Sequence, residues 1–415
     1  MKKHARKIII GWTAMLSVHC LFAQKECASF EYQQQLIKAN PPAEALFRAA
    51  ENFAKLHQSE RSSFDVGKII TIPVVVHILY HYPSENISDD VVESQMVALN
   101  RDYRKQNPDT TKIPSYFKVF AADCGIEFRL ATVDSEGRAT TGIIHKYSPV
   151  SLWTTDDKIK FSSQAGDDAW DTKSYLNIWV GNLETLLGYS SMPGSPTYKD
   201  GVVVNYGAFG ITHNGNYDQG RTCVHEVGHW LGLHHLWGDA LCGDDSVADT
   251  PKQETFTNGC PSGVRVSCSN GPNGDMYMDY MDFTNDDCLV MFTNGQKQKM
   301  QALFQPGGPR YSILFSNGLG VPTKAAIPPP DDEPQWLHVQ VYPNPAANEI
   351  TVNLAFDSRW VGNELIVLNE LGQIEMKSII NSKIQTLNIH KLKPGIYFIS
   401  AQKDKDKILQ EFVKF

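Results

Sequence analysis

One stretch of eleven residues constrains this chain more than any other part of it. It runs His225-Glu226-Val227-Gly228-His229-Trp230-Leu231-Gly232-Leu233-His234-His235. His225 and His229 are four positions apart, so on a helix they project from one face and can hold one ion. Gly232 allows the chain to leave that helix with unusual dihedral angles, and His235 then arrives as a third ligand. The spacing favours His235 over the neighbouring His234.

Three protein ligands leave the fourth position of a zinc ion open, which is typical of catalytic sites. Glu226 directly follows the first histidine, so it can reach a water molecule at that open position as a general base. A bare H-E-x-x-H also occurs in ordinary helices, but the added glycine and third histidine distinguish this stretch from them. The sequence therefore predicts a Zn²⁺ site at His225, His229 and His235.

Length and charge set further limits. A chain of 415 residues is longer than one typical domain, so we expect two or three. The formal net charge is −8 at pH 7, and no basic patch interleaved with aromatic residues is present. Both observations argue against nucleic acid as a partner.

The first 23 residues are typical of a signal peptide, because basic residues precede an apolar run that ends near Ala23. An uncleaved membrane anchor is the alternative, but Ser17 and His19 interrupt a run that is already short. We expect a protein that is exported through the periplasm, is secreted or displayed at the cell surface, and has no stable membrane span.

Four further regions follow the signal. Residues 24–61 are polar and helix-prone and are expected to be a pro-segment. Residues 62–316 alternate predicted strands and helices, which indicates an α/β catalytic domain. Residues 317–335 form a Pro-rich linker, and 336–415 contain short alternating strands that predict an all-β sandwich. Predicted strands of the catalytic domain cover 69–79, 126–133, 175–180 and 201–205, and predicted helices begin at 88 and cover about 219–231.

Four of the eight cysteines cluster after the zinc motif, at Cys242, Cys260, Cys268 and Cys288. An exported protein meets an oxidising environment, so two disulfides are expected, and the sequence leaves three pairings open. A second zinc cluster is the weaker alternative, because no C-x-x-C pair is present among them.

The region from about 65 to 315 resembles the pappalysin family of metzincin metallopeptidases, which includes ulilysin. The matching elements are Arg221-Thr222, the zinc motif, Trp237-Gly238-Asp239, Val247-Ala248-Asp249-Thr250-Pro251, Met278-Asp279-Tyr280, Asp286-Asp287-Cys288 and Met291-Phe292-Thr293. The resemblance implies an α/β (α+β) metzincin domain with a twisted mixed sheet and a zinc helix. It also implies a zinc endopeptidase that acts on proteins or peptides.

The resemblance assigns further roles. It implies that Met278 lies in the methionine turn beneath the zinc and that Tyr280 lies near the metal, as a ligand at rest or as an oxyanion stabiliser. It implies the disulfides Cys242–Cys268 and Cys260–Cys288. A preference for Arg or Lys just after the cut is also implied.

Calcium is a second cofactor that the resemblance implies, near the loop after the zinc helix. The local oxygen-bearing side chains are Asp244, Asp245, Asp249 and Thr250, and oxygen is the ligand that calcium requires. A solvated acidic loop is the alternative.

Latency is expected from Cys27 in the pro-segment. Its thiolate could occupy the open zinc position, the cysteine-switch arrangement known in this clan. The alternatives are an incidental cysteine or a disulfide with Cys124 or Cys223. A cut before Arg61 would fit self-processing by an Arg-directed enzyme.

The C-terminal region resembles the sorting domain of the type IX secretion route, which makes that machinery an expected partner. The matching pieces are Val341-Tyr342-Pro343-Asn344-Pro345-Ala346, Asn369-Glu370-Leu371-Gly372 and Leu392-Lys393-Pro394-Gly395-Ile396-Tyr397. A carbohydrate-binding sandwich is the alternative, with Trp360 as its candidate aromatic. For the whole chain, the alternative is a non-enzymatic adhesin that keeps the metzincin fold. A degenerate site often loses the glutamate of the motif, whereas Glu226 is intact in this sequence.

Overall fold

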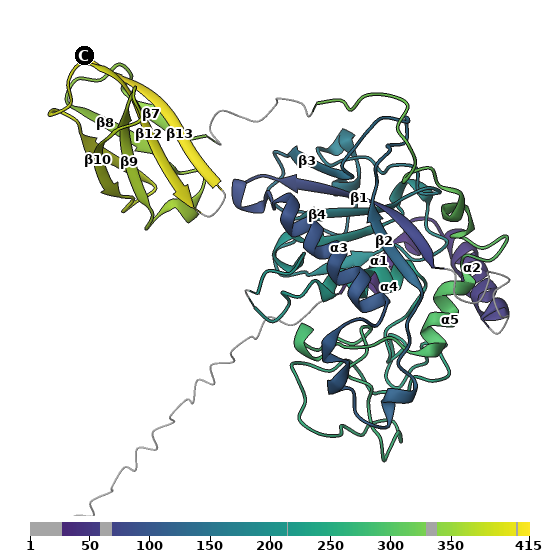
Figure 1. The fold of residues 1–415 in the computed structure, drawn as a ribbon. Helices are drawn as coiled ribbons and strands as arrows, with labels where there is room; N and C mark the ends of the chain where they lie inside the picture. The colour runs from purple at the N-terminus through teal and green to yellow at the C-terminus, as the bar shows by residue number, and fades with distance from the viewer. Residues whose placement is uncertain (1–26, 59–68, 214, 329–337, 404–405) are drawn as a thin grey trace, which may run out of the picture.

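The computed structural model describes residues 27–58, 69–213, 215–328, 338–403 and 406–415 (Figure 1). The expected signal peptide 1–23, the expected cut before Arg61 and residues 329–335 of the linker lie outside these ranges. Within the described ranges, no helix combines the length and apolar character needed to cross a membrane.

A six-stranded mixed sheet forms the centre of the larger domain, in the order β2-β1-β4-β6-β5, with β3 also beside β1. The strands are β1 Ile70–Tyr80, β2 Ile126–Leu130, β3 Ile143–Tyr147, β4 Leu176–Gly181, β5 Gly188–Ser190 and β6 Val202–Asn205. Only β5 among them runs antiparallel to its neighbour. Because β5 is also the last strand in the order, one of its edges has no partner strand among the described residues.

The two faces of the sheet are covered by different parts of the chain. Ile178 and Val202 join the core that contains the helices α3 Asp89–Tyr103 and α4 Arg221–Trp230. The alternate residues Trp179 and Val203 pack on the opposite face. There they meet buried side chains of α1 Ser29–Ala39 and α2 Ala43–His57, two helices that form the described part of the pro-segment region.

Arg221 fixes the start of α4. Its side chain is 1% exposed, and its nitrogens lie 3.2 Å from an Asp102 oxygen and 2.8 Å from an Asp109 oxygen. A buried guanidinium with two carboxylate partners keeps its charge, and these bonds hold the zinc helix against α3 and the loop that follows it.

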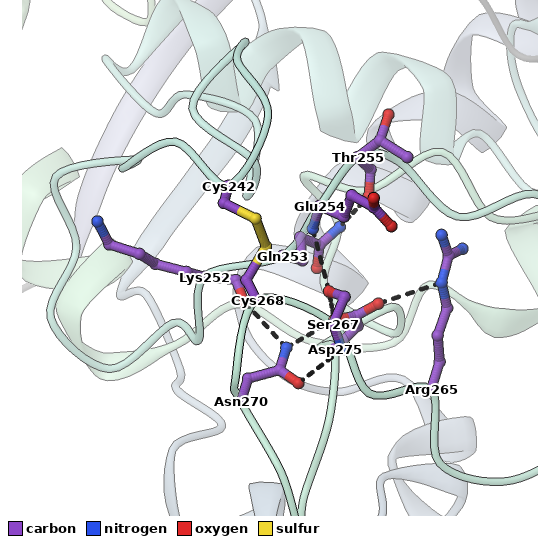
Figure 2. Close-up of a disulfide and its surroundings, with 10 residues drawn as sticks. All are labelled: Cys242, Lys252, Gln253, Glu254, Thr255, Arg265, Ser267, Cys268, Asn270 and Asp275. Carbon is purple, nitrogen blue, oxygen red and sulfur yellow. Dashed lines mark hydrogen bonds and ion pairs between the residues drawn. A yellow bond between two sulfur atoms is a disulfide. The ribbon is translucent and has the colours of Figure 1, made fainter.

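Loops make up most of the region between α4 and α5 Asn294–Ala302, and two disulfides hold them together. Figure 2 shows Cys242–Cys268, beside which the Asp275 carboxylate accepts hydrogen bonds from Ser267 and Asn270 and pairs with Arg265 at 3.2 Å. The second disulfide joins Cys260 and Cys288. Both pairings agree with those that the family resemblance implies.

The C-terminal domain is a sandwich of two antiparallel sheets, β10-β9-β12-β13 and β11-β8-β7. Its strands are β7 Gln340–Tyr342, β8 Glu349–Asn353, β9 Glu364–Asn369, β10 Ile374–Ile379, β11 Ile384–Asn388, β12 Gly395–Lys403 and β13 Asp406–Lys414. Val352 from one sheet and Ile399 from the other share one core. Trp360 is 4% exposed within that core, so it does not offer the open aromatic face that carbohydrate binding needs. The predicted all-β sandwich is confirmed.

Candidate metal centre

The three histidines of the motif converge on one point. The Nε2 atom of His229 lies 3.1 Å from Nε2 of His225 and 3.1 Å from Nε2 of His235. The two helical rings come from α4, and Gly232 with φ of +83° turns the chain so that the third ring returns to them. His234 points elsewhere, with its Nε2 atom 3.3 Å from Glu51.

The opposite nitrogen of each ring has an acceptor. Nδ1 of His225 lies 2.7 Å from the Tyr280 carbonyl oxygen, and Nδ1 of His229 lies 2.8 Å from that of Leu233. Nδ1 of His235 contacts the Asp239 carboxylate. Acceptors at Nδ1 require the hydrogen there, so each Nε2 presents a lone pair. Three lone pairs at this separation repel one another unless a cation lies between them, and the donor set therefore fits Zn²⁺.

Burial supports this protonation state. All three rings are at most 2% exposed. For His229, burial and then the neighbouring His235 lower the pKa well below its ordinary value. A neutral imidazole is the form that binds metal.

The pro-segment region enters this site. The Cys27 sulfur belongs, with the three histidine rings, to a group whose ligand atoms all lie within 4.8 Å of one another. It also lies 3.5 Å from Oε2 of Glu226. Ser29 donates a 2.9 Å hydrogen bond to the same Glu226 oxygen and accepts one from the Ser190 amide at 2.8 Å. Cys124 and Cys223 are separate buried thiols, so neither forms the alternative disulfide with Cys27.

Glu226 lies against the edge strand. A Cβ atom added to Gly188 would stand 2.9 Å from Cγ of Glu226, so β5 approaches the carboxylate as closely as a residue without a side chain permits. Cys27 forms a parallel bridge with Gly188, and the Ala28 amide donates to the Gly188 carbonyl at 3.1 Å. The pro-segment region therefore occupies the free edge of the sheet beside the Glu226 carboxylate.

The methionine beneath the histidines differs from the expectation. A Cβ atom added to Gly228, which lies in α4 between the two ligands, would be 2.5 Å from the sulfur of Met281. Met278 is buried in the same core, and its carbonyl accepts a 2.7 Å hydrogen bond from the Val290 amide. The sulfur in contact with the zinc helix is therefore that of Met281, three positions after the expected residue.

The aromatic residue beside the histidines shifts by the same three positions. The Tyr280 ring lies 4.7 Å from Phe292 and 5.7 Å from the Arg221 guanidinium, and its buried hydroxyl has no hydrogen-bond partner among the described residues. Phe283 instead contacts His225 and His235, with ring centres 5.5 and 4.9 Å away. Because Phe283 has no hydroxyl and Tyr280 packs in the core, neither can stabilise an oxyanion by side-chain hydrogen bonding in this arrangement. Tyr280 contributes its carbonyl oxygen to His225.

The sequence holds a signal for this shift that the motif comparison missed. Met278-Asp279-Tyr280 is followed at once by Met281-Asp282-Phe283, so the pattern methionine, aspartate, aromatic occurs twice in succession. Spacing alone does not choose between the two copies. The contact of Met281 with Gly228 identifies the second copy, Met281-Asp282-Phe283, as the one beneath the histidines.

The residues expected to bind calcium have protein partners. The Asp245 carboxylate accepts hydrogen bonds from the Thr250 hydroxyl at 2.8 and 2.9 Å. Asp249 accepts from the Thr293 hydroxyl at 2.7 Å and from the Gly295 amide at 2.9 Å, at the start of α5. These contacts fix the loop after the zinc helix and the N-terminus of α5 to each other.

Comparison with known proteins agrees with this geometry. Residues 160–305 match the family model described as pregnancy-associated plasma protein-A, and 340–414 match that of a secretion system C-terminal sorting domain. Extracellular metalloproteases of Arthroderma gypseum and Arthroderma otae are 30% and 32% identical, over 60% and 64% of this chain and 78% and 89% of theirs.

Solved structures extend the likeness. A promirolysin mutant of Tannerella forsythia is 40% identical with a TM-score of 0.65, covering 70% of this chain and 97% of that one. Mature mirolysin from the same organism, in complex with a cleaved peptide, is 42% identical with a TM-score of 0.60, covering 62% and 100%.

Fold and site together define a metzincin zinc metalloendopeptidase. The chain belongs to the pappalysin family, and it carries a sorting tail of the type IX secretion route. It is accordingly a secreted or cell-surface protein that acts on protein substrates.

The Asp239 contact yields a test of the metal centre. Replacing Asp239 with Asn removes the charge that orients His235, so we expect zinc affinity to fall roughly 10- to 100-fold. Competition with a chromogenic chelator measures that affinity. Asp244→Asn, an exposed acid in the following loop, is the matched control and should leave it unchanged. Equal affinities for the two variants would contradict the orientation attributed to Asp239.

Proposed function

We propose that Glu226 is the general base of this peptidase, that Cys27 and Ser29 hold the precursor latent, and that the processed enzyme prefers Arg or Lys just after the cut. The observation that carries the proposal is the joint position of Glu226 beside three convergent histidines and the free edge of β5. An extended peptide that pairs with this edge passes directly over the carboxylate.

His225, His229 and His235 would hold the zinc ion, which would supply Lewis acidity to lower the pKa of a water molecule and to polarise a carbonyl. The protein's own residues transfer the proton and orient the histidine rings. Glu226 accepts the proton of the attacking water and transfers it to the leaving amine. The carbonyls of Tyr280 and Leu233 and the Asp239 carboxylate keep the three rings in place.

Removal of the base tests the assignment. Glu226→Ala should lower casein cleavage by about 10²- to 10⁴-fold, because proton transfer is lost. Its zinc content, measured by atomic absorption, should match that of wild type. Glu93→Ala, an exposed carboxylate on α3, serves as the control. Near-native proteolysis by the Glu226 variant would overturn the role.

Latency is supported by two contacts at once. The Cys27 sulfur stands where it can reach a cation between the histidines, and Ser29 occupies an oxygen of the base. Burial and then the Glu226 charge raise the pKa of the Cys27 thiol. A divalent cation acts in the opposite sense and favours the thiolate, so the switch requires the metal.

The cysteine switch predicts a measurable change. An intact precursor with Cys27→Ala should cleave a quenched peptide faster than the wild-type precursor, because one occupant of the site is gone. Cys124→Ala, which removes a different buried thiol, should stay as inert as wild type. If the Cys27 variant is equally inert, the switch is wrong.

A basic preference needs an acidic neighbour of the site. Asp244 is exposed beside Lys252, and Asp249 is bound at α5, so these two are poor candidates. Asp282 directly precedes Phe283, is fully buried, and accepts hydrogen bonds from uncharged groups of Gln253 and Thr257. Burial raises its pKa to about 6. A cation nearby would therefore be favoured, which supports a basic side chain on this side of the site.

Cleavage of a proteome-derived peptide library tests this preference. We expect Arg and Lys to be enriched at the residue just after the cut, and Asp282→Asn to weaken the enrichment more than Asp244→Asn does. A profile without basic enrichment at that residue would remove the preference and leave the peptidase activity standing.

Calcium at the loop of Asp245, Asp249 and Thr250 stays a proposal. Its support is that burial raises the pKa of Asp245 to about 7, so that a cation beside this carboxylate would be stabilising.

A further inference from the structure

Tyr32 of the pro-segment region fills a polar pocket on the sheet face opposite α4. Its side chain is on α1, and the residue is 1% exposed. The hydroxyl donates a 2.9 Å hydrogen bond to Oδ2 of Asp157 and accepts one from Nζ of Lys160 at 3.2 Å. The ring lies 5.0 Å from that of Tyr189 on β5. The pocket thus satisfies both functions of a phenol, donor and acceptor.

The walls of this pocket hold together without Tyr32. Nζ of Lys160 lies 3.0 Å from Oδ1 of Asp157 and donates to the Lys199 carbonyl at 2.9 Å. Nζ of Lys199 lies 2.9 Å from Oδ2 of Asp157. The rings of Tyr189 and Trp179 flank the Lys160 ammonium, with centres 5.1 and 5.6 Å away. All these groups belong to the catalytic domain, so they remain when the pro-segment is removed.

Asp157 is held in an unusual backbone conformation that aims it at this pocket. Its φ is +67°, a region that residues with a side chain seldom adopt, and its carbonyl accepts the Lys160 amide at 2.8 Å. Such a conformation persists only where the surroundings fix it. The buried pair Asp157 and Lys160 is therefore a preformed binding element that does not depend on the pro-segment.

The pocket lies directly behind the strand that faces the metal centre. Along β5, Gly188 faces Glu226, and the next side chain, Tyr189, points to the opposite face. The pro-segment pairs in parallel, with Cys27 at Gly188 and Ser29 bonded to Ser190. A peptide that pairs antiparallel with β5 runs the other way. Its residues near Ser190 then precede the bond that is cut.

We propose that, in the processed enzyme, the Asp157–Lys160 pocket is a subsite for a tyrosine side chain on the N-terminal side of the cleaved bond. This inference rests on the proposed function, because the pocket opens only when the pro-segment leaves. Substrate side chains at alternate positions of a strand on β5 point to the face of Tyr189 and can enter the pocket. Tyrosine is selected because its hydroxyl replaces that of Tyr32.

The same chemistry excludes phenylalanine. A benzyl side chain fills the aromatic part of the pocket but gives up both hydrogen bonds of the phenol. The Asp157 oxygen then keeps only Lys199, and the Lys160 ammonium keeps only the Asp157 carboxylate and the Lys199 carbonyl. Sites built to hydrogen-bond a hydroxyl discriminate strongly against analogues that lack it, since the buried donor and acceptor that met the hydroxyl each lose one partner.

Quenched fluorescent peptides test the subsite with the processed, zinc-loaded enzyme. The peptides share one cleaved bond and carry Tyr, Phe or Ala at each of the four positions before it. We expect kcat/KM to be at least about tenfold higher for Tyr than for Phe at one of these positions. Asp157→Asn should reduce that ratio toward one, while Asp156→Asn, the adjacent exposed acid paired with Lys158, should preserve it.

The ratio of the Tyr and Phe rates is the readout, because a general loss of activity changes both rates alike. Binding of the same peptides to processed Glu226→Ala enzyme, measured by calorimetry, should show the same order of affinities. Equal rates for Tyr and Phe at every position, with casein cleavage intact and chelator-sensitive, would overturn the subsite. If casein is not cleaved either, the proposed function itself fails.

Discussion

Mutual repulsion of three imidazole lone pairs, relieved by one cation, is the interaction on which the rest of the catalytic domain depends. Each ring is oriented through its other nitrogen, and the three acceptors come from different segments, at Leu233, Asp239 and Tyr280. The helix α4, the loop after it and the turn near residue 280 must therefore meet. The disulfides Cys242–Cys268 and Cys260–Cys288 limit the freedom of the loops between them, where little regular secondary structure is available.

On the function proposed above, the pro-segment region and a substrate compete for the same features of that domain. Cys27 approaches the three histidines, Ser29 donates a hydrogen bond to Glu226, and Tyr32 fills the pocket behind β5. The groups that these three residues contact all belong to the catalytic domain, so they are still present in the processed enzyme. Parallel pairing with Gly188 makes the segment run along β5 in the direction opposite to that of an antiparallel substrate. In the proposed precursor, latency comes from occupation of a finished site and not from its distortion.

Sequence reasoning succeeded where the relevant spacing is local. The motif placed His225 and His229 on a helix predicted at 219–231 and observed at 221–230, with His235 after it, and the long hydrophobic strands were found within a few residues. Sequence reasoning failed for residues whose roles depend on contacts between distant parts of the chain. The doubled Met-Asp-aromatic pattern concealed Met281 and Phe283, and the three-residue strand β5 is too short to give a periodic signal. Ser29 and the Asp157–Lys160 pocket lie far apart in sequence from the groups they meet, so no spacing rule reveals them.

The described contacts between α1–α2 and the catalytic domain are hydrogen bonds, ion pairs and apolar packing, including Glu51 with Lys299. Cutting the chain between the two parts leaves all of these in place. After such a cut the proposed inhibitory helices and the catalytic domain would be two molecules, so their separation would depend on protein concentration. On that proposal, the fraction of free enzyme rises on dilution, so export into a larger volume would itself raise the activity.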